Sequence, residues 1–341
     1  MSTYSVGIIR DAPGLSEIAP AWNALWNRAA GATPFQSPLW LIPWWRAFEP
    51  GELFTIAVWR QSRSLVGLAP LYLETGPLGR RLLPLGISLS DYLDVLIDPE
   101  WFEPAARALG SQLTAADAPW DSCELGELAP EANALRLPCP ADWRNSTDPS
   151  QTCPVLNLPD DEEGLRSVLP RRKVRNVRMA WNRARRRGMV KIRTAHRETA
   201  HRLLCDFIRL HQARRQRLGE SGMFADARVE RFHQEAFGQL IEAGFARLYA
   251  LDVGGSTIGA YYGFVHRGRA LAYAFGFDPD WAFESPGTIL IWHAMADAIR
   301  EGAREFDFLR GRESYKYGWG AQDRCTHRRT FRRPEIDAHA C

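Results

Sequence analysis

The sequence lacks the segments that would tie the chain to a membrane or to an oxidising compartment. No apolar run reaches the ~20 residues that a membrane-spanning helix needs. The N-terminus has no basic region followed by an apolar core, so we expect no signal peptide and a cytoplasmic protein. The six cysteines form no CxxC pair and follow no zinc or disulfide spacing, so we expect reduced thiols and no metal site.

A strong overall charge is also missing, because the formal net charge is only +3. The segment 171–187 is nevertheless strongly basic, and its cations are Arg171, Arg172, Lys173, Arg175, Arg178, Arg183, Arg185, Arg186 and Arg187. Such a run is typical of a solvated helix face, or of a site for a phosphate-bearing ligand, a tRNA acceptor stem or anionic lipid headgroups. In a third interpretation Arg175 or Arg178 turns inward and contacts a substrate. Peripheral contact with a membrane through this segment stays open.

The length of 341 residues predicts two domains of ordinary size. Residues 129–153 are rich in proline and polar residues, which is typical of a connector. We therefore expect domains at 1–150 and 151–341. Hydrophobic periodicity predicts the element order β-α-α-β-β-β-α-β in both halves, and this matching order suggests duplicated domains of the α+β class.

The individual elements follow from the same patterns. In the first half we expect strands at 4–10, 54–59, 64–73 and 122–128, further extended stretches at 82–89 and 91–97, and helices at 15–29, 38–48 and 101–116. In the second half we expect helices at 162–187, 201–218, 227–243 and 288–300 and strands at 190–193, 245–253, 256–266, 269–277, 306–309 and 326–332. Pro170 is expected to interrupt the first of these helices.

Five motifs together resemble a known family: PFQSPLWLIPWW, GLAPLYL, SDYLDVLI, SPGTIL and FDFLRGRESYKYGW. Their order is similar to that of GNAT-superfamily acyltransferases, of the two-domain Fem-type transferases, and of GNAT-like proteins of cellulose and exopolysaccharide biosynthesis. The resemblance implies two tandem GNAT-like domains, each a mostly antiparallel central sheet flanked by helices. It also implies an N-acyltransferase that moves an acyl group from acyl-CoA, such as acetyl-CoA, to an amine or hydroxyl acceptor.

The acceptor implied by the resemblance is a small molecule or a glycan precursor, in polysaccharide or cell-envelope biosynthesis. Two alternatives stay open. One is a Fem-type transferase that takes its acyl group from aminoacyl-tRNA. The other is a non-catalytic member of a polysaccharide biosynthesis assembly that has kept the fold.

The donor is expected where a strand is followed by a helix N-terminus, because the first helical turn offers free N–H groups and a partial positive charge to phosphate. The resemblance places it on Phe275, Gly276, Phe277, Ser285, Gly287 and Thr288. The loop at 284–288 has only Gly287 of the glycines that the family has there. It also carries Glu284, whose carboxylate would repel a phosphate at short range, so a donor other than coenzyme A stays open. The other interpretation is a plain helix start, with Ser285 as N-cap and Pro286 in the first turn.

The catalytic residues are expected on the strand after this helix and on the segment that follows it. Acyl transfer to an amine needs a proton acceptor and donors for the developing oxyanion. We expect Tyr315 to protonate the leaving group, Lys316 or Arg310 to stabilise negative charge, and Glu313 to act as a base, with Asp307 at the strand end. The alternative is a surface ion-pair network that anchors the tail.

The remaining candidates are a base on another helix and an acceptor-binding set. His211 is a candidate base by residue type, although a packed histidine is the alternative. Direct attack in a ternary complex is expected, because no cysteine or serine lies in a nucleophile motif. The expected substrate-binding residues are Phe35, Gln36, Asp91, Tyr92 and Arg175.

Overall fold

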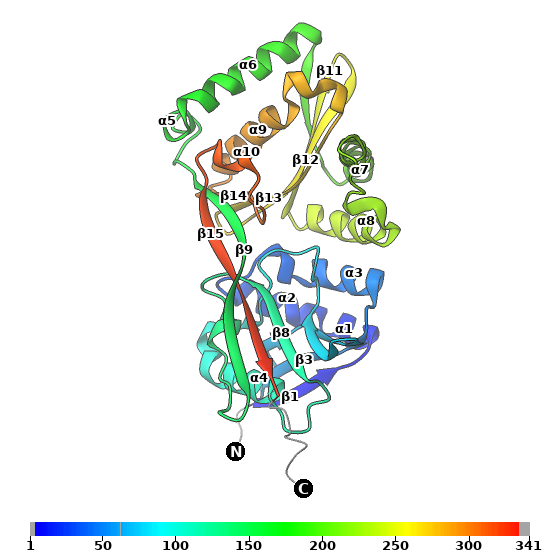
Figure 1. Ribbon diagram of the computed structural model, residues 1–341, viewed down its shortest axis with the longest axis vertical. Coiled ribbons are helices and arrows are strands. Elements are labelled where there is room, and N and C mark those ends of the chain that lie inside the picture. The colour runs from blue at the N-terminus through cyan, green and yellow to red at the C-terminus, as the bar shows by residue number, and fades with distance from the viewer. Residues whose placement is uncertain (1–3, 62, 334–341) are drawn as a thin grey trace. The chain divides into compact units, whose positions relative to one another are not determined.

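The computed structural model describes residues 4–61 and 63–333, and the chain divides into two compact units (Figure 1). The second unit is Thr152–Arg324, and the first holds the described residues up to Gln151 together with those from Cys325 onward. The predicted boundary lay close to the first of these divisions. The last strand differs from the prediction, because from Cys325 it belongs with the first unit rather than the second.

The first unit contains two groups of strands. One is an antiparallel sheet in the order β1-β3-β4-β7, formed by β1 (Tyr4–Ile9), β3 (Thr55–Arg60), β4 (Leu65–Ala69) and β7 (Leu96–Ile97). The other has the order β15-β8-β6-β5-β2, formed by β15 (Gln322–Arg332), β8 (Ser122–Leu128), β6 (Gly79–Pro84), β5 (Leu71–Gly76) and β2 (Glu52–Leu53). The helices are α1 (Ala12–Glu17), α2 (Ala19–Arg28), α3 (Pro38–Phe48) and α4 (Phe102–Leu113).

The second unit has the predicted order β10-α7-α8-β11-β12-β13-α9-β14. The strands are β10 (Val190–Thr194), β11 (Ala246–Val253), β12 (Ser256–His266), β13 (Arg269–Phe277) and β14 (Glu305–Asp307), and the end of β9 (Arg144–Asn157) follows β14 in the sheet. The helices are α5 (Leu165–Val168), α6 (Arg171–Arg187), α7 (Ala200–Arg217), α8 (Ala227–Glu242), α9 (Pro286–Arg300) and α10 (Ser314–Tyr317). Mostly antiparallel sheets flanked by helices confirm the predicted fold class.

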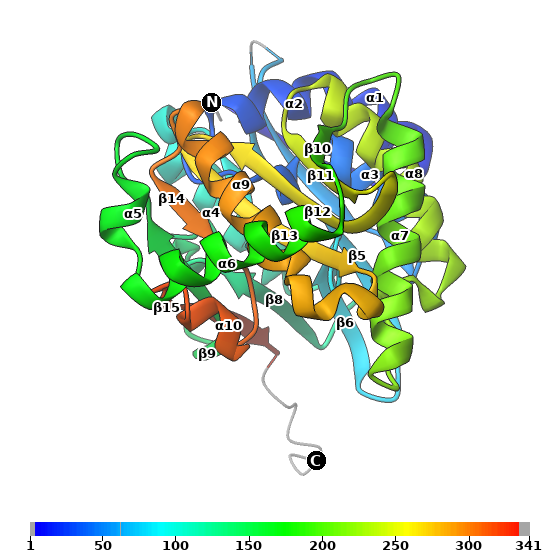
Figure 2. The same ribbon diagram turned by 90° about the horizontal axis from the view of Figure 1, so that it is seen from above.

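Helices cover both faces of the sheet in the second unit (Figures 1 and 2). The helices α7 and α8 lie on one face, and α9, backed by α6, lies on the other. Two glycines on neighbouring strands let these helices approach closely. A Cβ on Gly276 would lie 2.5 Å from the backbone nitrogen of His211 in α7, and one on Gly259 would lie 2.9 Å from Cβ of Pro286 in α9. The backbone of β13 is therefore in direct contact with α7 near the end of the strand.

Several element predictions need correction. The expected connector 129–153 runs into the 14-residue strand β9, which contains Pro149 and Pro154. Its polar residues gave no strand pattern, but its backbone lies beside β15, where Gln151 N–H donates to the Thr326 hydroxyl at 3.0 Å. The expected helix 15–29 is divided at Ile18, and the expected extended stretch 91–97 forms a strand only at its last two residues. The break at Pro170, between α5 and α6, is as predicted. Within the described part of the chain, no helix combines the length with the hydropathy that membrane crossing requires.

Candidate active site

The centre of the candidate site is a divergence of two parallel strands. β13 pairs with β14 only from Arg269–Leu271 to Glu305–Asp307, and β14 then pairs with β9 on its other side. The second half of β13 and the chain after β14 therefore separate. We use "splay" below for this opening between residues 272–277 and 308–311.

Aromatic rings from three segments line the splay. The Tyr315 ring of α10 lies edge-on to Phe275 of β13 and to Phe308 after β14, with ring centroids 6.4 Å and 6.2 Å apart. Burial first, and then the nearby Glu313 carboxylate, raise the pKa of Tyr315 well above its ordinary value. The phenol is therefore neutral at physiological pH and can donate a proton, as the sequence interpretation requires.

The α7 helix brings His211 to the end of β13, where its backbone contacts Gly276. The imidazole is 3% exposed and packs against Phe207 and Phe224. Burial, with smaller contributions from Arg215 and Arg214, lowers the pKa of His211 to about 4. Its buried Nδ1 has no hydrogen-bond partner among the described residues. Hence His211 is neutral at pH 7 and keeps a lone pair that could accept a proton.

Two of the predicted catalytic residues hold the loop after β14 in place. The Lys316 ammonium is buried and donates to the carbonyl oxygens of Leu309, Arg310 and Gly311 at 2.9, 2.8 and 3.1 Å, and it pairs with Glu313 at 3.0 Å. The fully buried Asp307 accepts a 2.7 Å hydrogen bond from the Leu309 N–H. Leu309 has a φ of 55°, a strained value for a leucine that surrounding contacts must maintain. These contacts give Lys316 and Asp307 a role in supporting the loop, and their part in catalysis stays a prediction.

The start of α9 has the geometry of an anion site. Ser285 is the N-cap, as predicted, with a φ of 56°, but its side chain makes no capping hydrogen bond. An added Cβ on Gly287 would meet nothing within 4 Å, so the space beside the first turn, which ends near Thr288, is open. Glu284 does not face this space unpaired, because its buried carboxylate lies 3.2 Å from the Arg187 guanidinium of α6. Arg183 donates to the Phe283 carbonyl at 3.0 Å, so two arginines flank the loop.

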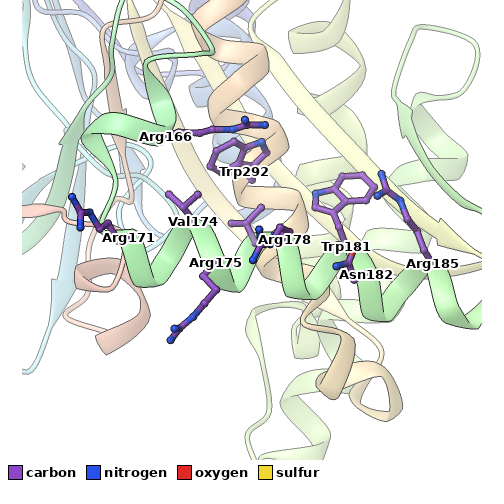
Figure 3. A pocket seen from close by; sticks show the side chains of 10 residues that line it. Arg166, Arg171, Val174, Arg175, Arg178, Trp181, Asn182, Arg185 and Trp292 are labelled. Carbon is purple, nitrogen blue, oxygen red and sulfur yellow. The ribbon is translucent and has the colours of Figure 1, made fainter.

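A basic groove of about 510 Å³ lies along α6 (Figure 3). Its lining comes from α5, α6 and α9 and consists of Arg166, Arg171, Val174, Arg175, Val177, Arg178, Trp181, Asn182, Arg185 and Trp292. The Arg185 guanidinium lies over the Trp181 ring at 5.2 Å. Arg175 and Arg178 thus line this groove. The sequence did not predict the groove, and contact of either arginine with a substrate stays a prediction.

The predicted acceptor residues of the first half form a buried cluster within the first unit. The Gln36 amide donates to the Tyr92 carbonyl, and its oxygen accepts from the Thr33 N–H at 2.6 Å. Phe35 is fully buried, Asp91 is 4% exposed, and Tyr92 has a φ of 57°. The structure therefore brings two of the sequence motifs together, and acceptor binding by these residues stays a prediction.

Sequence reasoning gave no individual role to Arg214, Arg183 or Arg187. Arg214 lies three residues after His211, and its guanidinium stacks over the Phe277 ring at 4.7 Å. The spacing of His211 and Arg214 along α7 was the available signal, because residues three apart share a helix face. The other two belong to the basic run, which gives no indication of which arginines face the donor loop.

Comparisons with known proteins agree with this geometry. A family model described as an acetyltransferase (GNAT) domain matches residues 171–317. The fold is similar to that of FemX, with a TM-score of 0.65 at 13% identity, over 91% of this chain and 95% of FemX. It is also similar to L-PGS from Bacillus licheniformis, with a TM-score of 0.57 at 12% identity, over 95% and 92% of the two chains.

A third similar structure is the C-terminal domain of a protein described as a lysylphosphatidylglycerol synthetase, from Agrobacterium fabrum. Its TM-score is 0.58 at 10% identity, over 93% of this chain and 92% of that one. The comparison with curated proteins gives no match. The family model covers less than half of the chain, so residues 171–317 are similar to a GNAT acetyltransferase domain, and at these identities the solved structures show a shared fold only.

Lowering the pH is expected to destabilise the protein through its buried histidines. The pKa of His211 in the folded state is about 4, below its ordinary value of 6.5, so the unfolded chain takes up the proton first as pH falls. Its contribution to stability is therefore present above pH 6.5 and is lost as pH falls toward 4. At about 1.4 kcal/mol per pH unit, His211 alone accounts for roughly 3 kcal/mol. His233 and His266 act in the same direction, because burial lowers the pKa to about 3 and about 4.

Urea unfolding of the wild type and of His211→Leu at pH 7 and pH 5 measures this effect. The variant should show a weaker pH dependence than the wild type. Equal dependence in the two proteins would contradict a neutral, buried His211.

Proposed function

We propose that this protein transfers an acyl group from acyl-CoA to an amine within a ternary complex at the splay. The observation that supports this most directly is the short parallel pairing of β13 with β14. Beyond it, Tyr315 lies edge-on to Phe275, Arg214 stacks over Phe277, and the backbone of His211 contacts Gly276. The donor phosphates would lie at the start of α9, where Gly287 leaves open space and Arg187 neutralises Glu284. The acyl carbonyl would lie in the splay.

The reaction is then a direct displacement. The amine nitrogen attacks the carbonyl carbon, a C–N bond forms, and the C–S bond of the thioester breaks. In this proposal His211 accepts a proton from the amine, with Glu313 as the alternative base, and the neutral Tyr315 phenol donates a proton to the leaving thiolate. A hydroxyl acceptor would follow the same steps with a C–O bond.

A second candidate donor is aminoacyl-tRNA, which the basic groove favours. Five arginines and two tryptophans in a concave surface suit phosphate and base contacts. The Fem-type resemblance points to the same donor, and the similar structures include a protein described as a lysylphosphatidylglycerol synthetase. Peripheral docking of 171–187 on anionic lipid would use the same charges. A role in polysaccharide or cell-envelope biosynthesis, in the cytoplasm, is the setting that we propose.

Donor binding separates these candidates, and we expect acetyl-CoA to raise the unfolding temperature. A ligand at a hundred times its Kd adds about 2.7 kcal/mol to the free energy of unfolding. The measurement compares acetyl-CoA, longer acyl-CoAs and charged tRNA on the wild type, Arg183→Gln at the donor loop, and Arg175→Gln with Arg178→Gln in the groove. Arg202→Gln, an exposed change on α7, is the matched control.

Each outcome selects one donor. Loss of the acetyl-CoA response in Arg183→Gln alone supports the coenzyme A site. A response to tRNA only, lost in the groove variant, supports the second candidate. No response to any donor would favour a non-catalytic protein that kept the fold.

A further inference from the structure

Arg214 lies at the open end of the splay, beside the last residue of β13. Its guanidinium is half-buried and stacks on the Phe277 ring, with the carbon 4.7 Å from the ring centroid. Among the residues that the structure describes, this side chain makes no hydrogen bond and no ion pair. Burial, and secondarily Arg215, lower the pKa of this guanidinium.

The charged side chains near Arg214 form ion pairs with other residues. Its neighbour Arg215 pairs with Glu220, and Glu313 pairs with the Lys316 ammonium. Tyr315, the other group that acts on it electrostatically, is a neutral phenol. Across residues 4–61 and 63–333, the positive charge of Arg214 therefore has no direct counterion.

Two other partly buried arginines of the same unit have carboxylate partners. Arg193 donates two hydrogen bonds to Asp252, and Arg247 donates two to Glu301. Arginines that only support the fold are paired in this way, because an unpaired charge that has lost part of its water costs free energy. Arg214 lacks such a carboxylate among the described residues, which indicates that its partner is part of a ligand.

We propose that Arg214 binds an anionic group of the acceptor, so that the acceptor is an amine that also carries a carboxylate or a phosphate. The ring of Phe277 fixes the plane of the guanidinium, and its N–H edge stays available for two parallel hydrogen bonds to an oxyanion. Binding there holds the acceptor beside Tyr315 and the end of α7. This inference rests on the proposed function, because it takes the splay as the transfer site.

Equilibrium binding of four small amines to the full chain tests the proposal. Glycine and O-phosphoethanolamine carry the two anions, and glycinamide and ethanolamine are their neutral counterparts. Thermal unfolding and tryptophan fluorescence are measured for the wild type, Arg214→Gln, Arg214→Lys and the control Arg217→Gln, an exposed arginine on the same helix.

We expect at least one anionic amine to bind the wild type and Arg217→Gln more tightly than its neutral counterpart does. Binding should weaken by roughly ten- to a hundredfold in Arg214→Gln and by less in Arg214→Lys. Glycine and O-phosphoethanolamine distinguish a carboxylate from a phosphate. Without ligand, Arg214→Gln should unfold at the same or a higher temperature, whereas a structural role would lower it.

The proposal is overturned if neither anionic amine binds better than its neutral counterpart, or if Arg214→Gln binds as tightly as the wild type. Acetyl-CoA binding is measured in the same proteins. If the wild type responds to acetyl-CoA but not to the anionic amines, only the proposed role of Arg214 is contradicted. A wild type that responds to no donor counts against the proposed function instead.

Discussion

Replacing Lys316 by methionine is expected to lower the free energy of unfolding by about 3 kcal/mol. The ammonium is buried and bonds three consecutive carbonyls, of Leu309, Arg310 and Gly311. Methionine matches the lysine in length but donates no hydrogen bond, so these carbonyls lose their partner next to a leucine with a φ of 55°. Urea unfolding at pH 7 gives the value.

Lys191→Met is the matched control, because Lys191 is an exposed residue of β10. We expect that change to stay within about 0.5 kcal/mol of the wild type. Equal stability of the two variants would show that the loop does not depend on Lys316. If Lys316→Met were as stable as the control but inactive, the original catalytic interpretation would be restored.

Tyr315→Phe should reduce turnover by about a hundredfold to ten-thousandfold, the range typical of removing a general acid. The hydroxyl makes no hydrogen bond to the described residues, so its removal should leave stability unchanged. Packing is retained, because phenylalanine keeps the ring contacts with Phe275 and Phe308. The measurement is the release of free thiol from acetyl-CoA in the presence of an acceptor amine.

Tyr317→Phe is the control on the same short helix. Its hydroxyl donates to Asp323 at 2.7 Å on an exposed surface, away from the splay rings. This variant should keep the wild-type rate. Donor binding, followed by thermal stabilisation, should be equal in all three proteins, and a wild-type rate in Tyr315→Phe would remove Tyr315 from the mechanism.

Local patterns were sufficient for most of the second unit. The strands β11 and β12 and the turn between them follow from apolar alternation around Gly254-Gly255, and α9 follows from helical periodicity after Pro286. These features depend on the geometry of neighbouring backbone groups, so they can be predicted from adjacent residues. The strand β9 was missed because its first half is polar and exposed, and its pairing with β15 involves residues far along the chain.

Side-chain roles depended on partners that only folding brings together. The sequence showed reactive groups crowded at 307–316, but enclosure of the Lys316 ammonium by three carbonyls is a property of the folded loop. Likewise, Glu284 is neutralised by Arg187, a residue 97 positions away. The sequence by itself determined the order of elements from β10 to β14, because periodicity is local. The tertiary structure decided which charged groups are paired and which, like Arg214, have no ion-pair partner among the described residues, because pairing depends on distances across the fold.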